Sequence, residues 1–272
     1  MPLRNIKVES EKQPPQSLQR DLDRPTAVDI YEQVSRNGRR ELQRPARALA
    51  ISGVVGGLTM GLTGLSVSVV SSLLGDTVAA QMVALLFYPM GFMAVILGRG
   101  QLFTENTLYP VALILAERRH VLATLRLWGI VFPANIAGAF LFALLAVRTK
   151  ALQPGQIHVL VQLGAQAAQP TMRHIFWSGV VGGWMIAMVA WLVSGSHSIT
   201  GSAAVIWALA FIVGAGHFAH CIATSGEVLS AVLGHGVALS TYFRWLIAAA
   251  SGNVVGGVVL VTLLEYGQVK LD

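Results

Sequence analysis

The chain has 272 residues, of which 54% are hydrophobic and only 12% are charged, and its mean hydropathy is +0.62. This composition lies well outside the balance of a soluble domain and identifies a membrane protein. The formal net charge of +6 would indicate nucleic-acid binding in a soluble chain. Here the basic residues cluster outside the apolar spans, where they set orientation, so we expect no nucleic-acid partner. The single cysteine, Cys221, excludes an intramolecular disulfide framework.

The first 47 residues are polar and contain ten Lys/Arg and seven Asp/Glu. They lack the short apolar region and small-residue cleavage site of a signal peptide, so we expect the chain to start in the cytosol. Residues 1–24 are predicted to be disordered, and Pro25, followed by TAVDIYEQV, predicts a short interfacial helix. A solvated tail is the alternative. The predicted domains are a cytoplasmic N-terminal tail over 1–46 and a six-helix transmembrane pore domain over 47–268.

Apolar segments long enough to cross a membrane recur along the rest of the chain. A hydrocarbon core of roughly 30 Å needs about 20 apolar residues per helix. Six units meet this requirement, and polar residues interrupt the second and the fifth. They cover about 47–73, 80–117, 121–147, 172–194, 202–236 and 242–266. An even number of spans places both termini on one side of the membrane.

Basic residues at the ends of the spans predict which side that is. The side of the tail holds its ten basic residues and three more, whereas the opposite side holds four. The three are Arg118, Arg119 and Arg126, and the four are Arg148, Lys150, Arg173 and Arg244. The positive-inside rule therefore predicts a multi-pass protein of a bacterial-type inner membrane, with both termini in the cytoplasm.

The chain also repeats itself. The sequence SGVVGG occurs at 52–57 and again at 178–183, and ANIAG at 134–138 resembles GNVVG at 252–256. Asn135 follows Leu102 by the same number of residues as Asn253 follows His220, so each Asn-x-x-Gly follows an interrupted span at one spacing. Because three helices are an odd number, successive halves must cross the bilayer in opposite directions. This predicts an all-α inverted 3+3 repeat with broken helices 2 and 5.

The two interruptions, GRGQLFTENTLYP at 98–110 and GHFAHCIATSGE at 216–227, are the candidate functional segments. Unpaired backbone groups are tolerated inside a membrane only where protein buries them or a cavity hydrates them, so polar breaks predict an inner pathway. Two breaks that face each other would offer N–H groups and positive dipole ends to an anion. We expect Asn135 and Asn253 to hold the broken loops by hydrogen bonds to freed backbone groups.

Glycines are spaced four residues apart in the first and fourth spans. They are Gly53, Gly57, Gly61, Gly179 and Gly183. Such strips allow helices to approach closely, so we expect a packing role, with lining of the pore as the alternative.

The order of three motifs resembles one known family. LFT lies in the first break, FAHCIA at 218–223 lies in the second, and GNVVGG at 252–257 lies in the sixth span. Together they are similar to the formate/nitrite transporter family over about residues 45–268, and the LFTEN loop resembles its less characterised inner-membrane branch. The resemblance implies a homopentamer of aquaporin-like protomers surrounded by membrane lipid. Each protomer would carry small monovalent anions such as formate or nitrite.

The same resemblance assigns the substrate pathway. His220 is implied to be the central pore histidine, Thr104 its neighbour in the facing loop, and Leu102 and Phe103 hydrophobic constriction residues. Phe218 belongs to the histidine motif, and His217 lies three residues before His220.

Several positions depart from the family pattern. Ala219 stands where an acidic residue usually precedes the histidine, and Gly183 stands before Trp184 where an asparagine is usual. No lysine occurs between Lys150 and Lys270, although the family has one ahead of the fourth helix. Arg173 and His174 are the nearest substitutes for attracting anions. These departures leave the substrate open.

A mechanism follows from solvation. A bare anion is costly to bring into a dry constriction lined by Leu and Phe, but its neutral acid is not. A group that lends the anion a proton removes most of the barrier, and histidine, with a reference pKa of ~6.5, suits this task. The alternative is that His220 is a buried polar group with satisfied hydrogen bonds. His217 and His220 have no Cys or carboxylate at a convincing spacing, so we expect no metal.

Glu105 is unexpected in an anion pathway, because a carboxylate repels the substrate and is costly to bury ionised. It should be protonated, or be paired with Arg99 or a histidine of the facing loop. One hypothesis is that Glu105 relays protons to His220 or His217 in place of the missing acid. The other is that it caps a half-helix that begins near Thr107.

Other function classes stay open or are excluded. No nucleophile–base pair or metal cluster is found, so we predict neither an enzyme nor a cofactor. A pore for another small weak acid or neutral solute, such as hydrosulfide or ammonia, is one alternative. A non-transporting structural or sensor protein is the other.

Overall fold

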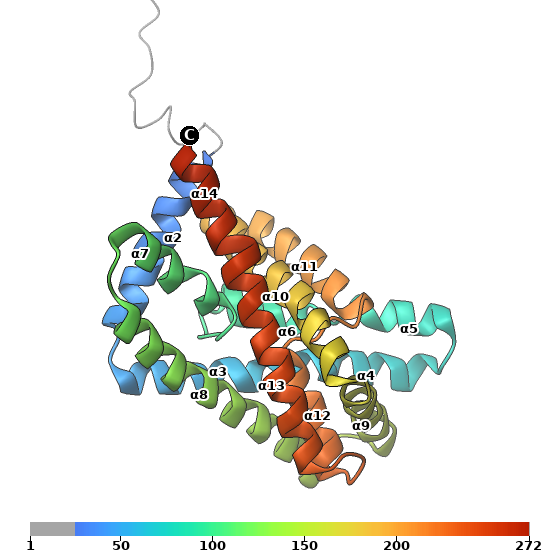
Figure 1. Ribbon diagram of the computed structural model, residues 1–272. Helices are drawn as coiled ribbons and strands as arrows, with labels where there is room; N and C mark the ends of the chain where they lie inside the picture. Colours follow the sequence, from blue (N-terminus) through green and yellow to red (C-terminus); the bar gives the residue numbers. More distant parts are fainter. Residues whose placement is uncertain (1–24, 272) are drawn as a thin grey trace, which may run out of the picture.

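The computed structural model describes residues 25–271, and that part of the chain is helical, with no strand (Figure 1). Five helical segments are long and apolar enough to cross a membrane by length and composition. They are Ala46–Leu74, Val78–Leu97, Val121–Arg148, Met172–Ser194 and Leu239–Leu271. The expected all-α fold with several apolar helices is confirmed. The predicted disorder of 1–24 lies outside the described residues.

The first half of the chain contains the first predicted interruption. Helices α3 (Ala46–Met60) and α4 (Leu62–Leu74) form the first apolar segment, and α5 (Val78–Leu85) and α6 (Met90–Leu97) form the second. The chain then leaves the helix over residues 98–104. It resumes as a short 3₁₀ turn, η1 (Glu105–Thr107), and as α7 (Tyr109–Glu117). Helix α8 (Val121–Arg148) follows.

Helix α9 (Pro154–Ala168) was not predicted. The predicted spans 121–147 and 172–194 left the residues between them without a helix, and this was wrong because α9 lies in that connection. The helix begins with a capping box between Gln153 and Gln156 and with Pro154 in its first turn. It is too short to be recognised as a span, and it packs against α12 and α4.

The second half contains α10 (Met172–Ser194), α11 (Ile199–Ala215) and α12 (Ala223–Leu233). The predicted fifth span, 202–236, consists of α11 and α12, and both are shorter than a membrane-crossing helix. The count by length is therefore five segments rather than six. The last segment is one long rod made of α13 (Leu239–Val255), the π-helical η2 (Gly256–Leu263) and α14 (Leu264–Leu271).

Close contact between helices depends on the predicted glycines. A Cβ atom on Gly57 of α3 would lie 1.9 Å from the Asn135 carbonyl oxygen on α8. A Cβ atom on Gly183 of α10 would lie 2.3 Å from the Asn253 carbonyl oxygen on α13. No side chain fits at either distance, so the predicted packing role is confirmed for these glycines.

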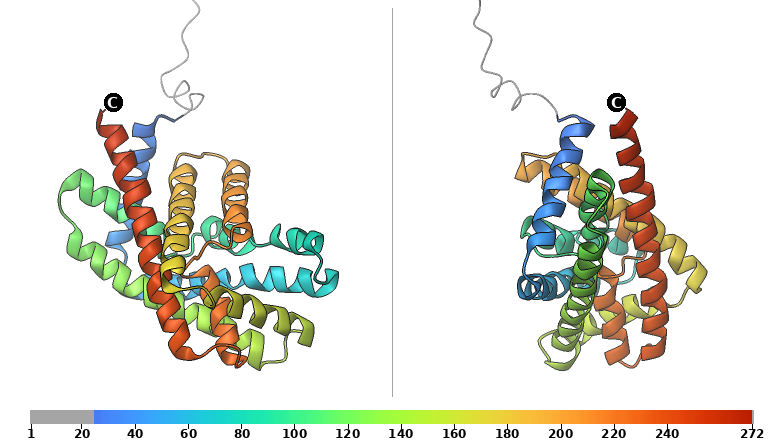
Figure 2. Two further views of the ribbon diagram at one scale, coloured as in Figure 1. Left: turned by 45° about the vertical axis from the view of Figure 1, so that its right-hand side comes forward. Right: turned by 60° about the vertical axis from the view of Figure 1, so that its left-hand side comes forward.

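Helix α2 (Ala27–Gln43) covers α7 at the end of the molecule where α14 also ends (Figure 2). It begins with a capping box between Thr26 and Asp29, in agreement with the predicted helix. The Tyr31 hydroxyl donates to the Ala112 carbonyl oxygen at 2.6 Å, and Arg39 forms an ion pair with Glu117. Both contacts hold α2 against α7.

The Arg39–Glu117 pair predicts how docking of α2 depends on pH. Glu117 is the last residue of α7 and lies outside the Val78–Leu97 and Val121–Arg148 segments. Hydrogen bonds from Arg39, His120 and Arg119 lower its pKa to about 2. A carboxyl with a lowered pKa in the folded state stabilises fully above its unfolded pKa, about 4.3, and loses this contribution as the pH falls toward 2.

We therefore expect Arg39→Gln to loosen α2. Amide hydrogen exchange over 27–43 should rise by up to about fivefold at neutral pH, because the pair is at the surface and its contribution is modest. Glu32→Gln is the matched control, since Glu32 pairs with Arg36 on the exposed face of the same helix. Equal exchange in both variants would contradict the docking role of the ion pair.

Candidate functional site

The two non-helical segments, 98–104 and 216–222, meet in the interior of the protein. Thr104 Oγ1 and His220 Nε2 lie 2.9 Å apart, and both residues are buried. The Ala223 backbone N–H donates to His220 Nδ1 at 3.0 Å. Since Nδ1 accepts, a neutral His220 carries its proton on Nε2, which donates to the Thr104 hydroxyl. That hydroxyl keeps its own hydrogen to offer elsewhere.

A buried asparagine holds the first segment. Asn135 Oδ1 accepts from the Phe103 N–H, and Asn135 Nδ2 donates to the carbonyl oxygens of Gln101 and Gly53, each at 2.8 Å. Ser52 Oγ accepts from the Gln101 N–H at 3.2 Å. These contacts give partners to backbone groups that the end of α6 leaves unpaired.

A second asparagine makes the same contacts in the other half. Asn253 Oδ1 accepts from the Cys221 N–H, and Asn253 Nδ2 donates to the carbonyl oxygens of Ala219 and Gly179, again each at 2.8 Å. Ser178 Oγ accepts from the Ala219 N–H at 3.0 Å. The repeated SGVVGG sequence thus supplies a serine hydroxyl and a glycine carbonyl to each site, which we name the two asparagine clamps.

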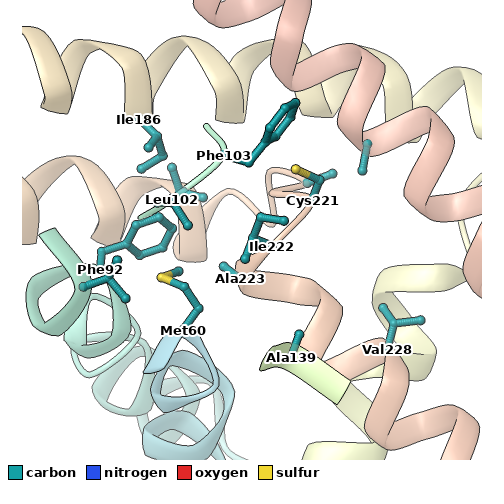
Figure 3. Packing of buried hydrophobic residues seen from close by; sticks show 14 of the residues in the cluster. Met60, Phe92, Leu102, Phe103, Ala139, Ile186, Cys221, Ile222, Ala223 and Val228 are labelled. Carbon is teal, nitrogen blue, oxygen red and sulfur yellow. The ribbon is translucent and has the colours of Figure 1, made fainter. Parts of the chain in front are cut away.

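Apolar side chains surround the Thr104–His220 contact. The Phe92 ring meets the His220 ring edge-on, with centroids 5.0 Å apart. Leu102 is completely buried, and it lies near Phe92, Met60 and Ile186 (Figure 3).

Phe103 points elsewhere. In Figure 3 it lies away from the cluster around Phe92, and its ring packs against Phe132 and Trp128 of α8, with centroids 4.7 Å and 5.7 Å away. Leu102 therefore lies in the cluster with Phe92, which contacts the histidine, whereas Phe103 packs on α8.

His217 and Phe218 lie outside this buried contact. His217 is exposed, with a φ of 50°, and lines a cavity of about 310 Å³ together with Phe218. His220 does not line that cavity. Within residues 25–271 no group of three or more His, Cys, Asp or Glu side chains could hold a metal ion.

Glu105 is buried in η1. It interacts electrostatically with Arg99 and with Tyr109, but it forms no salt bridge with Arg99. No side chain caps α7, whose N-cap residue is Leu108. The structure thus places Glu105 beside Tyr109, and a capping hydrogen bond from its side chain is absent.

A polar chain connects the first break to α2, and the sequence analysis missed it. Asn106 Nδ2 donates to Gln101 Oε1 at 2.9 Å, and Gln101 Nε2 donates to Glu41 Oε2 at 2.8 Å. Arg44 pairs with Glu41 at 3.0 Å. Asn106 Oδ1 is buried without a partner. The run of polar residues in an apolar span indicated that such a chain could exist. Glu41, the partner of Gln101 on α2, could not be identified because it lies about 60 residues earlier in the sequence.

Two cavities flank this region. The first is the cavity of about 310 Å³ that His217 and Phe218 line, and we name it the Glu227 cavity. Tyr88, Thr224 and Glu227 also line it. The second, the arginine cavity, measures about 300 Å³ and includes Arg36, Arg40 and Arg99 in its lining. Glu227 is a further residue that the sequence analysis missed, although a carboxylate in an apolar helix is itself a sign of function.

Comparisons with known proteins agree with this architecture. The chain is 29% identical over 276 residues to the inner membrane protein YfdC of Escherichia coli, a match that covers 98% of this chain and 87% of that one. It is 29% identical over 196 residues to a probable formate transporter of Methanothermobacter thermautotrophicus, covering 66% of this chain and 72% of that one.

Solved structures have the same fold. An FNT family ion channel superimposes with a TM-score of 0.80 at 18% identity and covers 89% of this chain and 99% of its own. A pentameric formate channel with formate bound superimposes with a TM-score of 0.71 at 20% identity, covering 84% and 98%. The family model described as formate/nitrite transporter matches residues 28–267. The chain therefore belongs to the formate/nitrite transporter family.

Proposed function

We propose that this protein is a membrane pore for small monovalent anions of weak acids, of the formate or nitrite type. The Thr104–His220 contact carries the proposal, because it joins the two breaks inside a buried apolar shell. The family and the relatives support transport rather than catalysis, since they are described as channels and transporters. No enzyme function is proposed.

The proposed architecture is an inverted 3+3 repeat of six spans, with α6/α7 and α11/α12 as the broken second and fifth units. The two asparagine clamps support it. In each clamp the amide accepts from a residue 32 positions earlier and donates to one 34 positions earlier. Identical contacts at identical spacing are expected when two halves of one chain have the same fold.

The proposed assembly is a homopentamer in the inner membrane. The pentameric formate channel among the structural neighbours supports this number. Exposed apolar side chains on the long helices, such as Leu122 on α8 and Ile247 on α13, fit contact with lipid or with neighbouring protomers. Both termini are proposed to be cytoplasmic, because α2 carries several arginines and docks on the connection that holds Arg118 and Arg119. Residues 1–46 would form the tail, and 47–268 the pore.

The proposed mechanism follows from the cost of dehydration. An anion that passes Leu102 and Phe92 loses its water, and a neutral acid crosses the same region at far lower cost. The Thr104 hydroxyl keeps a hydrogen that can be donated to the permeating species at this point, and His220 Nε2–H can donate to it on releasing Thr104.

Proton lending by His220 needs a change in its contacts. A neutral His220 can take up a second proton only on Nδ1, and that atom accepts the Ala223 N–H. The proposed imidazolium therefore requires this hydrogen bond at the start of α12 to break. Substitution of His220 tests whether proton lending or hydrogen bonding alone supports transport.

We expect His220→Phe to abolish proton-coupled uptake. In sealed proteoliposomes with an inward proton gradient, initial uptake of labelled formate or nitrite should fall by about 100-fold or more, the scale of a lost acid–base group. His220→Asn should instead leave anion leakage without proton coupling, because the amide keeps a hydrogen-bonding group that does not titrate. Internal pH and label uptake are recorded together.

The same assay includes hydrosulfide and ammonia as competing substrates. Uptake of either one without formate or nitrite would change the cargo but keep the pore. Absence of flux for the whole set in the unsubstituted protein would contradict transport and favour a structural or sensor role. Unchanged pH dependence in both variants would contradict the role of His220.

For Glu105 we propose a proton relay at the break of the second span. Glu105→Gln keeps size and hydrogen bonding but removes titration. The relay predicts that uptake loses most of its pH dependence, by about tenfold across the active range, while the oligomer keeps its elution volume. Retention of both the pH profile and stability in Glu105→Gln would show that the buried carboxyl is not a relay.

A further inference from the structure

Glu227 is a buried carboxyl that the proposed mechanism does not use. It lies in the middle of α12 and is 7% exposed. Among the described residues its carboxyl has neither a hydrogen-bond partner nor a salt bridge. Tyr88 is close enough to interact with it electrostatically. A carboxyl in such a position is costly to ionise.

The fold makes room for this side chain. A Cβ atom on Gly64 of α4 would lie 2.6 Å from Glu227 Cγ and 3.1 Å from its Oε1. A Cβ atom on Gly164 of α9 would lie 2.0 Å from the Glu227 carbonyl oxygen. Gly64 therefore leaves room for the Glu227 side chain, and Gly164 allows α9 to approach the backbone of α12 at the same residue.

Glu227 lines the Glu227 cavity, and other residues of its wall contact the central histidine or its neighbours. Tyr88 in its wall packs against Phe92 at a centroid distance of 6.0 Å, and Phe92 packs against His220 at 5.0 Å. The Thr224 N–H, in the same wall, donates to the His220 carbonyl oxygen at 3.1 Å. The wall of the cavity thus reaches the histidine backbone directly through Thr224 and the histidine ring through Phe92.

The titratable groups around this cavity are few. Tyr88, Glu227, His174 and His217 line it, and the latter two come from α10 and from the second break. The surfaces that α4, α9 and α13 contribute to the lining carry no charged side chain, and no arginine or lysine lines it. The arginine cavity differs, because it has three arginines in its wall.

We propose that Glu227 is a protonation site at which an entering anion becomes its neutral acid before it reaches His220. This inference rests on the proposed weak-acid transport. In the step, the Oε–H bond of Glu227 breaks and an O–H bond forms on the substrate oxygen, with no change in oxidation state. The carboxylate that remains takes a proton from hydronium in the cavity.

Substrate chemistry follows from this exchange. A small carboxylic acid and a glutamic acid side chain have similar acid strengths in water, and both lose hydration in the same cavity. Transfer between them is therefore close to balanced. The site fits a small carboxylate, and it disfavours a strong-acid anion, which would stay charged.

Glu227→Gln tests the proposal, because it keeps the shape and the hydrogen bonding of the side chain but removes the proton. In proteoliposomes we expect acid-driven uptake of labelled formate, and the proton uptake that accompanies it, to fall by about tenfold or more. Glu32→Gln, on the exposed face of α2, is the matched control and should behave as the unsubstituted protein does. Glu227→Asp keeps a carboxyl with a shorter reach and should lose less uptake.

Infrared difference spectroscopy gives a second measurement that does not depend on flux. The protonated carboxyl band of Glu227 should change when formate is added and should be missing in Glu227→Gln. A Glu227→Gln variant with the original pH profile, or absence of this band in the unsubstituted protein, would overturn the proposal. So would methylammonium uptake that depends on Glu227, since it would indicate a cation site. Absence of formate flux in the unsubstituted protein would instead contradict the proposed function.

Discussion

Each break in a membrane helix frees backbone N–H and C=O groups that lipid cannot hydrogen-bond, and this constraint governs the whole arrangement. Asn135 and Asn253 supply hydrogen-bond partners to these groups in the same way, since each accepts one backbone hydrogen bond and donates two. Because both amides are buried between helices, they need backbones that approach closely. The glycines opposite them, Gly57 and Gly183, permit this approach.

The asparagine clamps also determine which side chains are free of a structural role where the two breaks meet. They bind the backbone of the residues directly before and after Leu102 and His220. The side chains of Leu102 and His220 are therefore not needed to hold the two breaks in place. Thr104 and His220 meet there, with Phe92 closing the apolar side. In our proposal the apolar shell excludes bare anions. Thr104 and His220 donate hydrogen bonds to the neutral acids that pass. On either side the proposed path opens into cavities of opposite character, one with arginines and one with a lone carboxyl.

Sequence patterns predicted the parts of this arrangement that repeat at fixed spacing. The two Asn-x-x-Gly motifs and the two SGVVGG motifs could be found because each half contains the same contacts. Helix α9 could not be found, because it is too short for a span and its apolar face is visible only against α12. The surroundings of Glu227 and the partner of Gln101 were equally hidden, since Gly64, Gly164 and Glu41 come from distant segments. A single charged residue shows that a site exists but does not show what surrounds it.

The central claim is that Thr104 and His220 act as one unit across the two breaks, and a double-mutant cycle on transport measures this directly. Thr104→Val, His220→Asn and the double variant are compared for initial uptake of labelled formate under one proton gradient. Residues in direct contact couple by about 0.5–3 kcal/mol, so the double variant should lose far less than the product of the two single losses. Losses that multiply independently would contradict a joined site at the centre of the pore.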